Sequence, residues 1–157
     1  MDLVLGNHDI GLANLAPSGT EVIPAAGYVL DGIGYFHGHT WPDKALFKAE
    51  ALAAGHLHPA VRLRQPVGVS WSERVWARSP LLQEIIERQY GEALPAPEMI
   101  LVPAFNDLCG GLPLNEPLDD ERGPILAMAD LDRSRIYMTD GSDLGTLGGI
   151  KAAQRKL

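Results

Sequence analysis

Residues 51–58 read Ala-Leu-Ala-Ala-Gly-His-Leu-His, so a short apolar run stops at a glycine and is followed by two histidines. Such a run predicts a buried strand, and the glycine allows a tight turn after it. Apolar runs also precede two upstream clusters that contain histidine: Leu3-Val4-Leu5 precedes Gly6-Asn7-His8-Asp9, and Ile33-Gly34-Tyr35-Phe36 precedes His37-Gly38-His39. Polar groups just beyond strand ends are typical of sites in layered proteins, so we expect an α/β fold with one convergent site.

The rest of the chain predicts further short elements around these strands. The segment Leu30-Asp31-Gly32-Ile33 indicates a hairpin with a two-residue turn. Apolar residues at helical spacing predict a helix over residues 81–90, with Ser79-Pro80 at its start and Gly91 after its end. We also expect a short helix at residues 44–49, strands at residues 98–102, 125–129 and 134–138, a surface loop at residues 119–123 and a loose tail after residue 140.

Composition limits the classes of protein that need to be considered. The 157 residues fit one domain, and the formal net charge of −7 argues against a general polyanion-binding surface, so nucleic acid is a disfavoured partner. Cys109 is the only cysteine, which excludes an intrachain disulfide. The chain shows neither a signal-peptide pattern nor a long apolar run, so we expect a cytoplasmic protein with no membrane partner.

All five histidines of the chain lie in the three clusters, and none follows His58. Histidine is the commonest neutral metal ligand and donates protons near neutral pH, while the Asn7 side chain offers a carbonyl oxygen. Two histidines two positions apart can reach two metal ions about 3.5–4 Å apart. Taken singly, each cluster is also compatible with a plain turn or with exposed histidines at a strand end. The repetition of one chemical type at three strand ends favours a single metal site.

Together the three clusters resemble the later motifs of the calcineurin-like metallophosphoesterases, which are Gly-Asn-His-Asp, a lone His and Gly-His-x-His. Pro103-Ala104-Phe105-Asn106 and the Pro59 that follows His58 are further similar to an ICC-like branch of that family. Gly110-Gly111 and Asn115 share the same similarity. The resemblance runs from about Leu3 to Met138 and is thin between the motifs.

The resemblance implies two bound divalent cations, most often Mn²⁺, with Fe or Zn²⁺ as alternatives. Asn7, His37 and His56 match the residues that bind one of the two ions. His58 matches a ligand of the other. The implied activity is hydrolysis of phosphodiesters or phosphomonoesters by an activated hydroxide.

The remaining polar residues of the clusters also match positions of the family pattern. His8 corresponds to the general acid that stabilises the transition state, and Asp9 to the residue that orients it. His39 matches a second histidine that stands behind the ligands or contacts phosphate.

The family's two earlier motifs, Asp-x-His and Gly-Asp-x-x, do not occur before Gly6. We therefore expect residues 1–157 to form one N-terminally truncated phosphoesterase domain, an incomplete β-sandwich with flanking helices whose N-terminal strands are missing. Asp107, Asp130, Asp132, Asp140 and Asp143 could replace the absent carboxylates, but none lies in the missing pattern.

Activity of this chain alone is accordingly expected to be impaired. The alternatives that stay open are a non-catalytic remnant or partner-binding module, a chain completed by another polypeptide or by oligomerisation, and a DNA repair nuclease.

Overall fold

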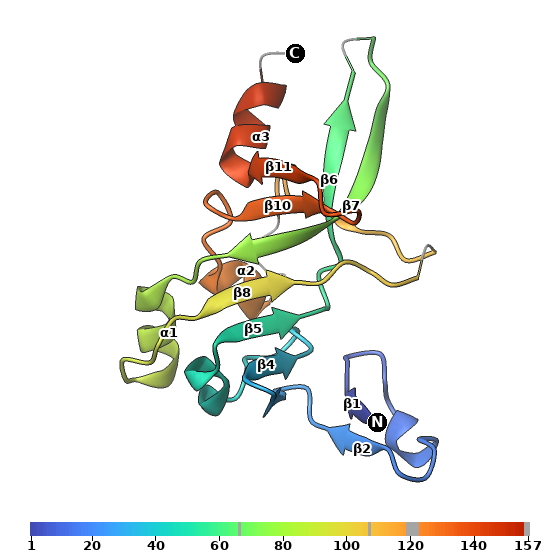
Figure 1. Ribbon diagram of the computed structural model, residues 1–157, viewed down its shortest axis with the longest axis vertical. Helices are drawn as coiled ribbons and strands as arrows, with labels where there is room; N and C mark the ends of the chain where they lie inside the picture. The colour runs from blue at the N-terminus through green and yellow to red at the C-terminus, as the bar shows by residue number, and fades with distance from the viewer. Residues whose placement is uncertain (66, 107, 119–122, 156–157) are drawn as a thin grey trace.

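The protein is mixed α/β and mostly sheet (Figure 1). The computed structural model describes residues 1–65, 67–106, 108–118 and 123–155. The strands are β1 (Asp2–Val4), β2 (Glu21–Ile23), β3 (Tyr28–Leu30), β4 (Ile33–Phe36), β5 (Ala51–Ala54), β6 (Pro59–Arg64), β7 (Ser70–Ser79), β8 (Glu98–Leu101), β9 (Leu112–Pro113), β10 (Arg135–Met138) and β11 (Asp143–Thr146). The helices are η1 (Leu12–Asn14), η2 (Lys44–Lys48), α1 (Gln83–Tyr90), α2 (Pro124–Met128) and α3 (Leu147–Gln154), where η marks a 3₁₀ helix.

The main sheet has nine strands, and its principal order is β11-β10-β7-β8-β5-β4-β3. The central strands β4, β5 and β8 are parallel, whereas β3 and β7 join them antiparallel on either side. The first half of the long strand β7 pairs with β6, and this hairpin extends away from the rest of the sheet (Figure 1). The carboxyl ends of the parallel strands therefore lie at one common edge of the sheet.

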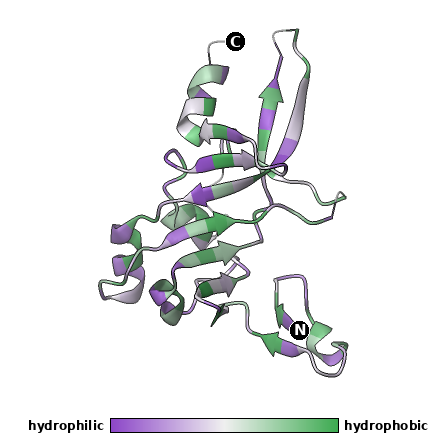
Figure 2. Ribbon diagram, viewed as in Figure 1, coloured by the Kyte–Doolittle hydropathy of each residue, from purple (hydrophilic) through white to green (hydrophobic). Residues whose placement is uncertain are grey.

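The core lies on one face of the main sheet. Alternate residues of the central strands point into it, so Leu52 of β5 and Met99 of β8 are fully buried and pack with Ile86 of α1. Burial of each such side chain contributes about 1.5–3 kcal/mol. The opposite face is less covered, since Tyr35 and Trp76 are each 38% exposed. In Figure 2, β5 and β8 are largely hydrophobic, whereas α1 carries hydrophilic residues.

β1 and β2 form a separate two-stranded parallel sheet near the N-terminus (Figure 1). Their register pairs Asp2 with Glu21 and Val4 with Ile23. The loop after β1 meets the main sheet at β4, since Asn7 contacts His37. The N-terminal unit therefore presents the first histidine cluster to the other two.

Several predictions of local structure are confirmed. The hairpin β3–β4 turns at Asp31 (φ 49°) and Gly32 (φ 80°), which is the backbone of a type I′ turn. η2 begins after Asp43, whose side chain accepts a hydrogen bond from the Ala45 N–H. Gly91 ends α1 in the left-handed conformation.

Other predictions of local structure are wrong. Ser79 is the last residue of β7, its hydroxyl bonds to that of Ser134 at 2.7 Å, and α1 begins only at Gln83. Of the strand expected at residues 125–129, residues 125–128 belong to helix α2, and Ala129 forms only an isolated β-bridge with Leu81. The segment after Asp140 is not loose, because it forms β11 and α3. The loop expected at residues 119–123 lies, apart from Gly123, outside the described residues.

The α/β class is confirmed, while the specific β-sandwich of the metallophosphoesterases stays a prediction. Within the described ranges the sheets are the nine-stranded sheet and the two-stranded β1–β2 pair. Helices that accompany the main sheet, α1 and α2, are consistent with the expected flanking helices. No helix in the described part of the chain is long and apolar enough to cross a membrane.

Candidate metal centre

The second and third histidine clusters lie side by side because β4 and β5 are parallel and in register. Phe36 pairs with Ala54, so His37 and Gly55 leave neighbouring strand ends at the same edge of the sheet. The chain continues from His58 directly into β6, which begins at Pro59. The prediction that these clusters converge at strand ends is therefore met by the topology of the sheet.

Three imidazole rings gather at this edge. The ring centroid of His37 lies 5.0 Å from that of His39 and 5.1 Å from that of His56. The centroids of His39 and His56 are 5.9 Å apart. All three rings are partly buried. These distances place the three rings next to one another.

The first cluster joins this group through Asn7. Its side-chain Oδ1 lies 3.0 Å from Nε2 of His37, so the Nε2–H tautomer of the histidine donates a hydrogen bond to the amide oxygen. Asn7 and His8 are both exposed. The loop that carries them closes on itself, because the Gly6 N–H donates to Oδ2 of Asp9 at 2.6 Å.

Close approach explains why glycine occupies position 6. A Cβ atom on Gly6 would lie 2.7 Å from Cε1 and 2.9 Å from Nδ1 of His37. Distances below 3.0 Å are essentially never seen for real Cβ atoms. The absence of a side chain therefore lets the loop after β1 pack directly against the His37 ring.

The third cluster adopts an unusual backbone. His56 and His58 both have positive φ angles, 49° and 47°, in a region that is uncommon for residues other than glycine. Leu57 between them is buried, with 6% of its surface exposed. The buried Leu57 thus lies between two left-handed histidines whose imidazoles are both partly exposed. Strained residues of this kind cluster at functional sites.

Burial and mutual repulsion keep two of the rings neutral. The pKa of His37 is lowered to about 4, first because its ring is withdrawn from water and then because His56 and His39 repel its cation. The pKa of His56 is also lowered, first by burial and then by neighbouring rings that include His8. Neutral imidazole is the form that binds metal ions, so both rings are ready ligands at neutral pH.

The His39 ring has an unpaired buried nitrogen. Its Nδ1 is inaccessible to solvent and has no hydrogen-bond partner in the described part of the structure. Such an atom ordinarily carries a free-energy penalty of about 1–3 kcal/mol. The role of His39 behind the ligands or against phosphate stays a prediction.

The spacing of Asn7 and His37 suits a metal ion. Two ligand atoms that bind one ion at about 2.1 Å and at right angles lie about 3.0 Å apart. The measured separation of Oδ1 and Nε2 is 3.0 Å. Among the described residues, however, no group of three or more His, Cys, Asp or Glu side chains is already arranged around one point. The donors fit a divalent ion in type and spacing, but their orientation is that of a hydrogen-bonded pair.

The site is poor in negative charge. The clusters contain the carboxylate of Asp9, which accepts a hydrogen bond from the Gly6 N–H. Its charge opposes the lowering of the His37 pKa, but burial and the neighbouring rings have the larger effect. In the described chain Asp9 makes no hydrogen bond to His8, so its orienting role stays a prediction. Of the substitute carboxylates considered, Asp132 and Asp143 pair with Lys151 and Arg135 instead. Asp107 lies outside the described residues.

A cavity of about 360 Å³ adjoins the third cluster, and the sequence did not reveal it. It is lined by His56 and His58 on one side and by residues 110–113 and 116–118, including Glu116, on the other. The amide of Leu112 donates to the carbonyl oxygen of His58 at 2.9 Å, which holds the two segments together. In the sequence, the pair Gly110-Gly111 is the indication of this cavity, because two glycines let the backbone approach a neighbouring segment closely.

Comparisons with known proteins return nothing: no family model, no curated protein and no solved structure matches this chain.

Proposed function

We propose that this chain supplies the histidine side of a two-metal phosphoesterase site that hydrolyses phosphodiesters or phosphomonoesters. The observation that carries the proposal is the 3.0 Å approach of Asn7 Oδ1 to His37 Nε2 beside the rings of His39 and His56. Polar donors from three segments far apart in sequence meet at the carboxyl edge of parallel strands. A purely structural explanation would have to account for an exposed asparagine, an unpaired His39 nitrogen and two left-handed histidines in one place.

Asn7, His37 and His56 are proposed as ligands of one divalent cation, Mn²⁺ in preference to Fe or Zn²⁺, and His58 as a ligand of a second. When bound, such a pair of ions activates water and neutralises charge on phosphoryl oxygens. The depressed pKa values of His37 and His56 hold both rings unprotonated at neutral pH. No proton therefore has to be displaced from an imidazolium when an ion binds.

His8 is proposed as the general acid. It lies exposed at the end of the loop after β1, and it is close enough to His56 to lower the pKa of that ring. An exposed imidazole at the rim can donate a proton to the leaving-group oxygen of a bound ester. Asp9 fixes the loop that carries His8 by accepting the Gly6 N–H hydrogen bond.

The neutral donor set predicts weak catalysis by this chain alone. Two dications surrounded by imidazole and amide ligands keep most of their positive charge, so their affinity falls without carboxylates. Carboxylates from a second polypeptide or another copy of this chain would restore the balance. A non-catalytic binding module is the alternative, and it would bind metal without turnover in any complex.

Calorimetric titration of Mn²⁺ into the wild-type chain and into the Asn7→Ala variant tests the proposal. We expect binding by the wild type and a loss of about tenfold in affinity in Asn7→Ala, since one ligand oxygen is removed. Asn14→Ala is the matched control, because Asn14 is exposed in η1 and contacts no histidine cluster. Equal affinity in all three proteins would refute the assignment of Asn7.

Hydrolysis of bis-p-nitrophenyl phosphate with added Mn²⁺ supplies the second measurement. We expect slow turnover that His8→Ala removes, while Mn²⁺ binding by that variant stays within about twofold of the wild type, since His8 is not among the proposed ligands. Fast turnover by the chain alone would contradict the inferred shortage of carboxylates. Turnover unaffected by His8→Ala would contradict the general-acid role.

A further inference from the structure

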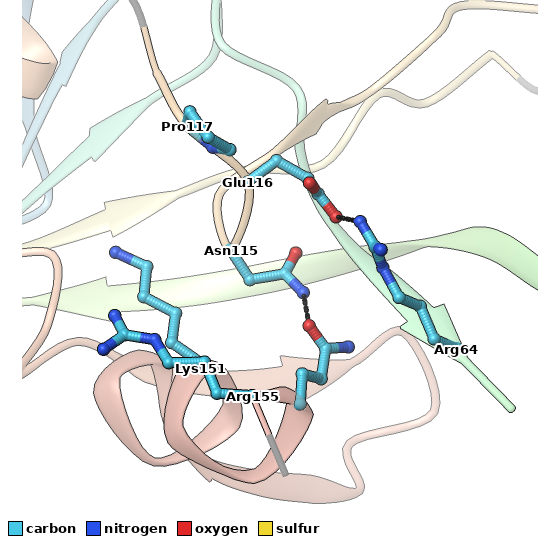
Figure 3. A pocket seen from close by; sticks show the side chains of 7 residues that line it. Arg64, Asn115, Glu116, Pro117, Lys151 and Arg155 are labelled. Carbon is cyan, nitrogen blue, oxygen red and sulfur yellow. Dashed lines mark hydrogen bonds and ion pairs between the residues drawn. The ribbon is translucent and has the colours of Figure 1, made fainter. Parts of the chain in front are cut away.

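A second polar cavity lies between β6, the turn at residues 115–117 and helix α3 (Figure 3). Its volume is about 420 Å³. The lining includes Arg64, Asn115, Glu116, Lys151, Gln154 and Arg155. None of these residues belongs to the histidine clusters.

Hydrogen bonds fix the floor of this cavity. The side chain of Asn115 accepts from the backbone N–H of Arg62 and donates to its carbonyl oxygen, both at 2.8 Å. Asn115 also donates to Gln154 Oε1 at 2.7 Å, and Gln154 Nε2 donates to the same Arg62 carbonyl. The last turn of α3 is thereby tied to β6, which sets where the charged residues of that turn can reach.

Lys151 lies in α3 and Arg155, four positions later, is the residue that caps its C-terminus, so both lie on the same face of the helix. Figure 3 shows both side chains extending from α3 to the same side of Asn115, while Arg64 reaches Glu116 from the other side. The Lys151 ammonium donates one hydrogen bond, to Asp132 Oδ1 at 2.8 Å. An ammonium group has three N–H donors. In the described part of the chain, the Arg155 guanidinium has no ion pair.

The charge balance of this cavity differs from that of the whole protein. Three cations and one carboxylate line it, although the chain has a formal net charge of −7. The carboxylate is that of Glu116, which forms an ion pair with Arg64 at 2.6 Å. The Lys151 ammonium and the Arg155 guanidinium, which extend to the same side of Asn115, suit a phosphate group, which accepts bidentate and charge-assisted hydrogen bonds.

This cavity adjoins the one beside the histidines. Glu116 and Pro117 line both cavities. Along β6, Pro59 and Arg62 are three residues apart, which is about 10 Å in a strand. A phosphate bound near Asn115 and a phosphate bound near His58 are therefore too far apart to belong to one pyrophosphate.

We propose that Lys151 and Arg155 form a phosphate-binding subsite that holds a second, distal phosphate of an elongated phosphoester. The assignment of this phosphate to the substrate rests on the proposed function of the histidine site. The phosphate-binding property of the cavity itself does not rest on it. An elongated substrate with phosphates at both ends would lie along β6 and contact both cavities.

Amide NMR titration with pyrophosphate, in the presence of EDTA, tests the subsite without any metal. We expect shifts centred on residues 151–155 and Arg64, and about tenfold weaker binding in Arg155→Gln, because a charge-assisted contact is lost. Arg133→Gln is the matched control, since that arginine is exposed and lies outside the cavity. Asn7→Ala should bind pyrophosphate as the wild type does. Unchanged affinity in Arg155→Gln, or shifts spread over the surface, would overturn the subsite.

A second titration distinguishes a substrate phosphate from a free one. With Zn²⁺ present, a 5′-phosphorylated thymidine trinucleotide should shift residues 56–58 and 151–155 together, and Arg155→Gln should weaken its binding about tenfold, by loss of the same charge-assisted contact. Thymidine monophosphate is too short to span both cavities, so its shifts at residues 56–58 and at residues 151–155 should follow separate affinities, and Arg155→Gln should weaken only the binding seen at residues 151–155. Shifts at the cavity alone would overturn the link to the histidine site and leave the phosphate site standing.

Discussion

The side-chain oxygen of Asn7 lies 3.0 Å from Nε2 of His37, although the two residues are thirty positions apart. This contact connects the small β1–β2 unit to the carboxyl edge of the main sheet. It brings the first polar cluster to the second, and the register of β4 with β5 brings the second to the third.

Gly6→Ala should disturb the site through steric contact alone. The added methyl would meet Cε1 of His37 at 2.7 Å, so the ring or the loop must move by several tenths of an ångström. We expect about 1–3 kcal/mol lower stability in chemical denaturation, as for other overpacked positions, and weaker Mn²⁺ binding. Gly110→Ala is the control, because a methyl there meets nothing within 4 Å. Equal losses in the two variants would refute the steric explanation.

Substitutions at the two left-handed histidines should reverse the usual order of stability, in which alanine variants are more stable than glycine variants. His56 and His58 have φ angles of 49° and 47°, so glycine should be more stable than alanine at both positions by about 1 kcal/mol. His39 does not have a positive φ angle, and there alanine should be the more stable residue. Urea denaturation of the six variants measures the order, and alanine ahead of glycine at position 58 would contradict it.

Stability should decrease as the solution is acidified. The pKa of His37 is about 4 in the folded protein and 6.5 as its ordinary value, so the unfolded chain binds more protons between these limits. Unfolding free energy should therefore rise with pH from about 4 to 6.5 and level off above. His37→Asn, which cannot titrate, should flatten this dependence in urea denaturation followed from pH 4.5 to 7.5. An unchanged slope in the variant would exclude His37 as the cause.

Local patterns predicted those elements whose signals are local. The Asp31-Gly32 turn needs two residues with positive φ, and asparagine, aspartate and glycine tolerate that conformation. Gly91 ends α1 for the same reason. The apolar runs before all three histidine clusters likewise predict strands, and each run contributes to one, β1, β4 and β5.

Elements that depend on distant contacts were not predictable in this way. Ser79 resembled a helix cap, but its hydroxyl is used by Ser134, which is 55 residues further along the chain. The short apolar run at residues 125–129 fits a strand or a helix equally well, and only packing against the sheet selects the helix. Gly148-Gly149 suggested a loose tail, yet Thr146 caps α3 by accepting from the Gly149 N–H.

The sequence indicates which residues make up the candidate site, but not their geometry. Spacing of two positions within a cluster indicates a shared direction only if the backbone stays extended. His56 and His58 are instead left-handed. The cavity shared by His56, His58 and Glu116 depends on the pairing of β6 with β9, for which the sequence carries no local signal.

The most direct test of the metal centre is NMR of the histidine ring nitrogens during titration with Zn²⁺ at neutral pH. We predict that the ring nitrogens of His37 and His56 shift together and saturate at the same concentration, because both bind one ion. Asn7→Ala should move that saturation to higher Zn²⁺. Five rings that shift independently, or rings of His37 and His56 that do not respond, would contradict a metal centre at the edge of the sheet.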